Sequence, residues 1–189
     1  MRIKITTESP DTLTREGLAL GFFIDERPPR GQCGLIDWRL NGLISRELAR
    51  GRITGTFMEK VLIATSPRVP AAKIMLMGMG TLAELTYEKL YLAGYHLSKD
   101  MDGLLCREFA FNLPAAGRCH LSISGMAEAM IRGCFDFLSS DIEKWATCST
   151  TVLADAAYLK EVIDGVNSFR CNVRDVSVIE IEGVTEEGQ

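Results

Sequence analysis

The segment with the clearest potential for ligand chemistry is residues 73–82, which read KIMLMGMGTL. An apolar run that stops at a Gly-Met-Gly turn and continues into a helical pattern is typical of a buried strand leading into a helix. Glycines at such a junction let the backbone approach a ligand, and the free N–H groups of a new helix bind phosphate or carboxylate. Gly78, Met79, Gly80 and Thr81 are therefore the candidate ligand-binding residues.

The same residues also have a purely structural interpretation. A GxG motif without a third glycine is a weak signal for a nucleotide site, and no Lys or Ser follows at the spacing of a P-loop. Thr81 can cap the next helix together with Glu84, three residues further on. We favour a turn in which the glycines serve backbone geometry and helix–sheet contact, and keep the ligand site as the alternative.

Other reactive side chains do not combine into a site. Cys119 and His120 are adjacent, and adjacent residues rarely face each other as a nucleophile and its base. Neither Asp100 with Asp102 nor Asp136 comes with the oxygen-rich loop of a calcium site or with a partner for acid–base catalysis. The two histidines lack the spacing of a zinc site. The sequence thus predicts no catalytic residue, no metal site and no cofactor.

Composition narrows the class of protein. The chain has 189 residues, 47% of them hydrophobic and 24% charged, which suits one globular domain. A net charge of −4 without a basic stripe argues against a nucleic-acid partner. The first ten residues lack the apolar core of a signal peptide, and the apolar runs are too short to span a membrane. Six scattered cysteines indicate reduced thiols. We expect a cytoplasmic protein with one domain over 1–183 and a flexible acidic tail over 184–189.

Hydrophobic periodicity predicts the order of the elements. Strands are expected at 2–6, 17–25, 56–65, 71–78, 104–113, 145–153 and 176–183, with a loop at 25–34 and helices at 35–51, 82–101, 122–140 and 156–166. This alternation predicts a three-layer α/β/α sandwich with a mixed central sheet.

The clearest helix is 122–140, whose apolar stripe around Met130 and Ile131 should face the sheet. Its Gly125 and Gly133 each cost about 1 kcal/mol relative to Ala unless close packing needs them.

Three segments resemble the N-terminal domain of the leucyl aminopeptidase family: RITGTFMEKVLIAT, KIMLMGMGTLAELTYEKLYLAGYHL and MAEAMIRGCFDFL. The family has a glycine before a strand, here Gly55, and a Gly-hydrophobic-Gly turn before a helix, here Gly78 to Gly80. It also has an aromatic-x-aromatic pair at a helix end, here Phe135 and Phe137. The resemblance spans about residues 15–140 and extends weakly to LKEVIDGVNSFRCNVRD.

The resemblance implies a macro-domain-like fold. It does not imply peptidase activity, since the family's two-metal site lies in a larger C-terminal domain marked by an Asn-Thr-Asp-Ala-Glu-Gly-Arg segment, which does not occur before Gln189. The expected role is that of a stand-alone, non-catalytic domain that acts in oligomerisation or protein contact, as a homo-oligomer or with a protein partner.

A macro-like fold is also compatible with an alternative function. Macro domains elsewhere bind ADP-ribose in a crevice beside strand ends, so the chain can be a module that binds or hydrolyses ADP-ribose or a related nucleotide, with its site at Gly78–Thr81. The second glycine-rich phosphate loop and the adenine-contacting Asp of such binders are not evident in the sequence.

Overall fold

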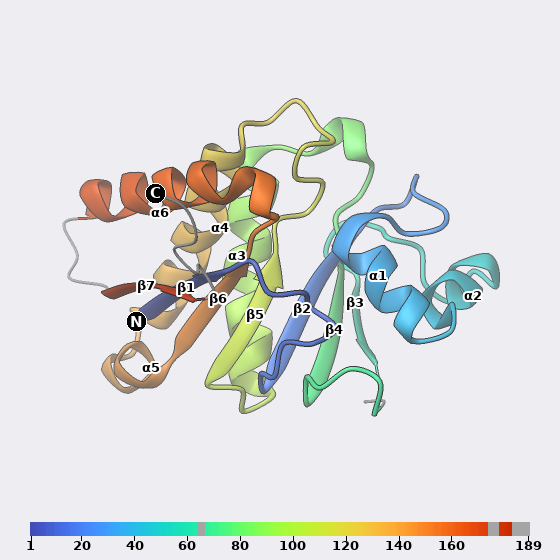
Figure 1. The fold of residues 1–189 in the computed structure, drawn as a ribbon, viewed down its shortest axis with the longest axis horizontal. Coiled ribbons are helices and arrows are strands. Elements are labelled where there is room, and N and C mark those ends of the chain that lie inside the picture. Colours follow the sequence, from blue (N-terminus) through green and yellow to red (C-terminus); the bar gives the residue numbers. More distant parts are fainter. Residues whose placement is uncertain (64–66, 174–177, 183–189) are drawn as a thin grey trace, which may run out of the picture.

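The computed structural model describes residues 1–63, 67–173 and 178–182 (Figure 1). The strands are β1 (Arg2–Thr6), β2 (Gly17–Phe22), β3 (Lys60–Ile63), β4 (Lys73–Gly78), β5 (Glu108–Asn112), β6 (Ser149–Leu153) and β7 (Val178–Glu182). The α-helices are α1 (Gly31–Arg39), α2 (Leu43–Ala49), α3 (Tyr87–Gly103), α4 (Ile123–Leu138), α5 (Ile142–Thr147) and α6 (Leu159–Val173). Two 3₁₀ turns, η1 (Leu82–Glu84) and η2 (Ala156–Tyr158), precede α3 and α6.

The described strands form one seven-stranded sheet in the order β3-β4-β2-β5-β6-β1-β7. All neighbouring strands are parallel except β3, which runs antiparallel to β4 at the edge. Strand β4 is almost entirely buried, as its uninterrupted apolar sequence predicts for a strand covered on both faces. The predicted α/β/α sandwich with a mixed sheet is confirmed.

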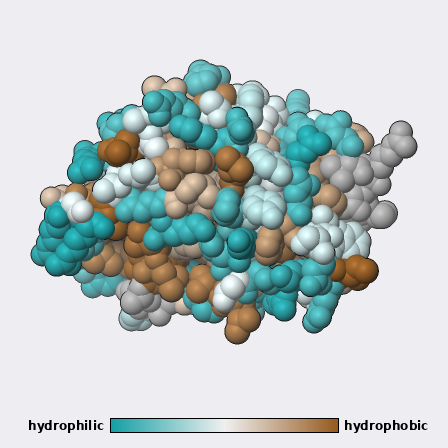
Figure 2. Space-filling model, turned by 180° about the vertical axis from the view of Figure 1, so that it is seen from behind, coloured by the Kyte–Doolittle hydropathy of each residue, from teal (hydrophilic) through white to brown (hydrophobic). Residues whose placement is uncertain are grey.

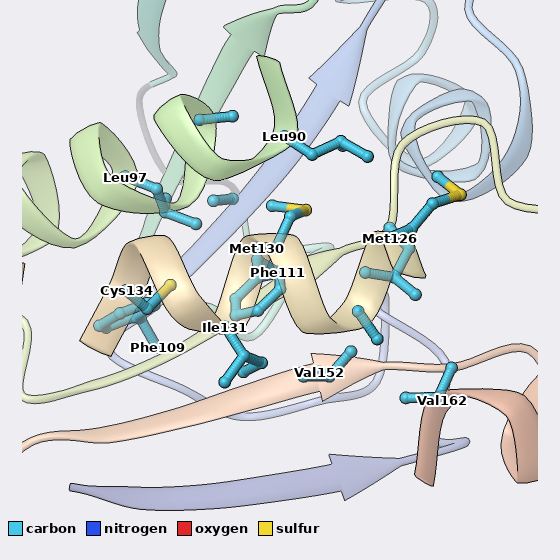
Figure 3. Close-up of a cluster of buried hydrophobic side chains, with 14 of the residues drawn as sticks. Leu90, Leu97, Phe109, Phe111, Met126, Met130, Ile131, Cys134, Val152 and Val162 are labelled. Atoms are coloured by element: carbon cyan, nitrogen blue, oxygen red, sulfur yellow. The ribbon is translucent and has the colours of Figure 1, made fainter. Parts of the chain in front are cut away.

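Two apolar cores lie on the two faces of the sheet. The larger one joins the sheet to α3, α4 and α6, and Figure 3 shows its centre, with Met130 and Ile131 of α4 close to Phe111 of β5. The smaller one joins β2 and β4 to α1 and α2 on the opposite face. The apolar stripe of α4 is buried along its whole length, which confirms the predicted orientation of this helix. No described helix is long and apolar enough to cross a membrane.

Glycines allow α3 and α4 to approach each other closely. A Cβ atom at Gly133 would lie 2.1 Å from the carbonyl oxygen of Tyr91, and one at Gly94 would lie 2.2 Å from that of Met130. Any side chain at these positions would push the helices apart. Close helix contact therefore explains why Gly133 stands in the middle of a helix despite its low propensity.

The predicted helix at 35–51 is wrong in its extent. Helix α1 begins earlier, at Gly31, inside the predicted loop, and α2 is a separate helix. Asn41 and Gly42 separate them with φ angles of 56° and 70°, which Asn and Gly tolerate best. The Asp37 carboxylate accepts a hydrogen bond from the backbone N–H of Ile44 at 2.7 Å, so it supports the start of α2.

The predicted strand at 145–153 is wrong over residues 145–147, which belong to α5. Asp141 caps this short helix, since its Oδ1 accepts hydrogen bonds from the backbone N–H groups of Glu143 at 2.9 Å and Lys144 at 3.3 Å. The capping Asp before an alternating pattern was the signal for a helix start that the strand prediction missed.

Two further strands are shorter than predicted because turns precede them. Strand β3 begins only at Lys60, after Met58 with a φ of 67°, and β5 begins at Glu108, after Leu105 with a φ of 58°. Helix α6 extends past the predicted end at residue 166. The predicted tail at 184–189 lies outside the described residues.

Shortening Met130 tests the larger core. Its side chain is 3% exposed, so Met130→Ala should lower the free energy of unfolding by about 2–5 kcal/mol, measured by urea denaturation. Arg132→Ala, at an exposed position of the same helix, is the control and should change the stability by no more than about 0.5 kcal/mol. If both variants unfold at the same urea concentration, the apolar stripe of α4 would lie outside the core.

Candidate functional site

The Gly78–Thr81 junction lies at the end of β4, and its backbone is hydrogen-bonded to the end of β2 and to the loop before β3. The N–H of Met79 donates to the carbonyl of Phe22 at 2.8 Å, and the N–H of Gly80 donates to that of Gly55 at 2.9 Å. A phosphate bound here would have to compete with these hydrogen bonds.

Gly78 and Gly80 are each required at the junction for a different structural reason. A Cβ atom at Gly78 would lie 2.1 Å from the carbonyl oxygen of Thr56, so no side chain fits there. Gly80 has a φ of 78°, a conformation that other residues adopt with strain. This geometry agrees with the turn interpretation. Ligand binding by Gly78, Met79, Gly80 and Thr81 stays a prediction.

The predicted capping role of Thr81 is wrong. Thr81 makes no capping hydrogen bond, and the N–H of Leu82 donates instead to both carboxylate oxygens of Asp25, at 3.1 and 3.2 Å. Residues 82–84 form only the short turn η1, and α3 starts afresh with Thr86 as its cap, accepting from the N–H of Lys89 at 3.2 Å.

Glu59 holds the loop that lies against the junction. Its carboxylate accepts hydrogen bonds from the N–H of Gly55 at 2.6 Å and from both the N–H and the hydroxyl of Thr54, at 2.9 and 2.8 Å. Burial by itself would raise the pKa of Glu59, but these hydrogen bonds favour the charged form and lower the pKa below its ordinary value.

The concave site expected of this fold lies elsewhere, at the carboxyl ends of β5 and β6, where ligands of parallel α/β sheets bind. Its walls come from the start of α1 at Gly31, from the loop after β5, including Ala115 and Arg118, and from the chain after β6, including Asp155 and Tyr158. We call it the crevice. Its volume is about 30 Å³, which holds one or two water molecules.

The protein's own side chains fill the crevice. Arg118 forms an ion pair with Glu26, which is 8% exposed. Tyr158 packs onto Gly117, where a Cβ atom would lie 2.1 Å from the tyrosine hydroxyl oxygen. Asn112 accepts a hydrogen bond from the N–H of Gly21 at 2.9 Å. A pocket for a drug-sized ligand is typically 300–1,000 Å³, roughly tenfold larger or more.

The crevice lies outside the site predicted from the sequence, because that prediction rests on the glycine pair after β4. The signal was the stretch NLPAAGRCHLS at 112–122, a second strand-to-helix connection that contains a glycine and ends in the helix cap Ser122. Cys119 and His120 lie in this connection, and the Cys119 Sγ contacts the Met126 sulfur rather than the imidazole.

Two grooves also lie on the surface of the described part of the chain. The wider one, of about 650 Å³, runs between α3 and α4, and several of its polar side chains have hydrogen-bond partners. Tyr91 donates to Asp136 at 2.9 Å, which raises the pKa of Tyr91, and Glu128 accepts from Ser168 and Asn172, each at 2.9 Å. Among the described residues, no three His, Cys, Asp or Glu side chains are grouped so as to hold a metal ion.

The second groove, which we call the β3 groove, is apolar. It measures about 220 Å³ and lies between the edge strand β3 and α2. Its lining is Leu43, Ile44, Glu47, Ile53, Val61, Leu62, Ile63 and Leu76. Leu62 is 56% exposed, and Figure 2 shows hydrophobic atoms gathered on this edge of the molecule.

The family of the chain follows from comparison with known proteins. The model of the N-terminal domain of the cytosol aminopeptidase family matches residues 19–140, well over half of the chain. The chain belongs to this family. The resemblance inferred from the sequence is therefore confirmed.

Curated relatives are much longer than this chain. A probable cytosol aminopeptidase of Geobacter sp. (strain M21) is 29% identical over 138 residues, which are 72% of this chain and 28% of the relative. One of Cyanothece sp. (strain PCC 7425 / ATCC 29141) is 28% identical over 90 residues, 48% of this chain and 18% of the relative. The chain thus spans about a quarter or less of the length of these family members.

Solved structures confirm the macro-domain-like fold. A tomato leucine aminopeptidase mutant matches with a TM-score of 0.61 and 17% identity, covering 92% of this chain and 37% of the plant enzyme. The Oceanobacillus iheyensis macrodomain with MES bound matches with a TM-score of 0.71 and 11% identity, covering 89% of this chain and 92% of that one. At this identity the likeness shows the fold alone.

The hydrogen bonds of Glu59 predict a pH-dependent contribution to stability. Because the folded-state pKa is lowered, the charged Glu59 stabilises the fold at neutral pH, and this contribution is lost as the pH falls below the ordinary value of 4.5. Glu59→Gln should therefore melt below the wild type at pH 7, with the difference shrinking in acid, as measured by calorimetry. Glu8→Gln, at an exposed loop position, is the control. A Glu59→Gln deficit that stays the same in acid would contradict this assignment.

Ligand binding at the glycine junction can be tested directly. We expect millimolar ADP-ribose to leave the melting temperature unchanged, whereas a ligand at 100 times its dissociation constant would add about 2.7 kcal/mol of stability. Gly80→Ala should cost on the order of 1 kcal/mol or more, because of its positive φ, without any ligand. Micromolar ADP-ribose binding that a normally stable Gly80→Ala variant loses would show that the turn interpretation is wrong.

Proposed function

We propose that this chain is a non-catalytic domain that acts through protein contact, either by self-association or by docking on a partner protein. The observation that carries the proposal is the β3 groove, a connected apolar surface beside an edge strand with Leu62 more than half exposed. Leaving apolar surface in water is unfavourable, and contact with a protein would bury it.

The match to the N-terminal domain of the family supports the same role. In the alternative, a module for ADP-ribose or a related nucleotide, the crevice would be the binding site. Its volume of about 30 Å³ and the Arg118–Glu26 ion pair give that alternative less support. A nucleotide would have to displace side chains that already satisfy one another.

We place this function in the cytoplasm. The six cysteines are unpaired, four of them buried, which suits a reducing compartment. The net charge of −4 speaks for protein partners rather than nucleic acid.

Two measurements on the purified chain test the proposal. Sedimentation equilibrium should give a mass above the 20.9 kDa of one chain that rises with concentration. A chromogenic leucine substrate with added manganese or zinc should show no turnover. Metal-dependent hydrolysis that a chelator abolishes, in a preparation free of contaminating peptidase, would contradict the non-catalytic role.

A further inference from the structure

We infer that β3 is the contact strand of a symmetric homodimer, in which it pairs antiparallel with β3 of a second copy of this chain. The inference rests on the proposed function and specifies its surface and its occupant. It follows from the hydrogen-bonding geometry of β3, from the charges at this edge, and from the shape of the β3 groove.

Strand β3 leaves one side of its backbone open. Among the described residues, it is the last strand of the sheet on its side and pairs only with β4. Gly78 exchanges hydrogen bonds with Met58 and Glu59, at 2.9 and 2.8 Å, just before the strand. Because hydrogen-bonded and non-hydrogen-bonded pairs alternate in an antiparallel ladder, Val61 and Ile63 bond to β4, whereas the N–H and C=O groups of Lys60 and Leu62 point outward.

The charged side chains near β3 give this edge little protection against pairing with another chain. Natural edge strands avoid pairing with other chains by carrying lysines and other charged side chains. Here the Lys60 ammonium is held by Asp100 of α3 at 2.8 Å. Glu47, the charged residue of the β3 groove, pairs with Arg50 and Arg52, each at 3.1 Å. The side chain that remains most exposed on β3 itself is the apolar Leu62.

A second copy fits this edge because an antiparallel edge is complementary to itself. A two-fold axis normal to the sheet, passing beside Val61, sets Val61 opposite Val61 of the second copy and Lys60 opposite Leu62. The outward groups of Lys60 and Leu62 then form backbone hydrogen bonds in both directions. The axis also brings the two β3 grooves together on the same face, so that the Val61 and Ile63 side chains of both copies cover them.

The size of the contact predicts its strength. Four residues of strand and one small groove per copy make a small contact, whereas stable complexes bury roughly 1,200–2,000 Å². We therefore expect a reversible dimer whose population rises with protein concentration.

The first experiment is sedimentation equilibrium on the full chain and two variants. Leu62→Lys sets a lysine opposite Lys60 of the second copy and should weaken dimerisation at least tenfold. Ile142→Lys changes a residue that is 85% exposed on α5 and should dimerise like the wild type. Melting temperatures check that both variants stay folded.

The second experiment tests the register by disulfide formation. In a Cys171→Ser background, which removes the exposed native cysteine, Val61→Cys should give a covalent dimer under mild oxidation, because paired residues across such an axis lie within disulfide reach. Ile142→Cys in the same background is the control and should form a covalent dimer more slowly than Val61→Cys at equal concentration.

The outcomes separate this inference from the proposed function. A wild-type dimer that Leu62→Lys weakens and Val61→Cys links supports the β3 contact. A dimer that Leu62→Lys leaves unchanged overturns the β3 contact while self-association stands. A wild type that stays monomeric at millimolar concentration overturns the inference and removes self-association from the proposed function, leaving docking on a different protein.

Discussion

The hydrogen bonds of the Glu59 carboxylate position both the glycine junction and the edge strand β3. They hold the N–H groups of Thr54 and Gly55, and the carbonyl of Gly55 in turn accepts from Gly80 at the end of β4. The loop and the glycine junction thereby fix each other. Strand β3 leaves this loop directly, so its register on β4, and the edge it presents, depend on the same few bonds.

This constraint explains why glycines cluster here. Gly55 has a φ of 87°, and a Cβ atom on it would lie 2.7 Å from the backbone of Phe23. Gly78 admits no side chain for the same kind of reason. Three backbone segments meet at contact distance around β2 and β4, and only residues without a Cβ let them do so. A glycine pattern that suggests a phosphate site from sequence can thus serve backbone contact instead.

The carboxyl-terminal side of the sheet and its β3 edge differ in how they meet solvent. At the carboxyl ends of β5 and β6, Arg118, Glu26 and Tyr158 use the space in which ligands of this fold class bind. At the β3 edge, the backbone and Leu62 have no such cover over residues 60–63. This difference supports the proposal of protein contact over that of capture of a small molecule.

The sequence by itself determined the sandwich fold, the family and the buried stripe of α4, because periodic burial and short glycine motifs are local patterns. It also placed β1, β2, β4 and β7 within predicted strands. It misjudged places where single residues override the pattern: Asn41 and Gly42 split a helix, and Asp141 starts one inside a predicted strand. Only the tertiary structure decided which strand lies at the edge, that Asp25 rather than Thr81 caps the turn after β4, and that the crevice is filled. Each of these depends on residues distant in sequence, such as Glu26 and Arg118, whose meeting no local pattern encodes.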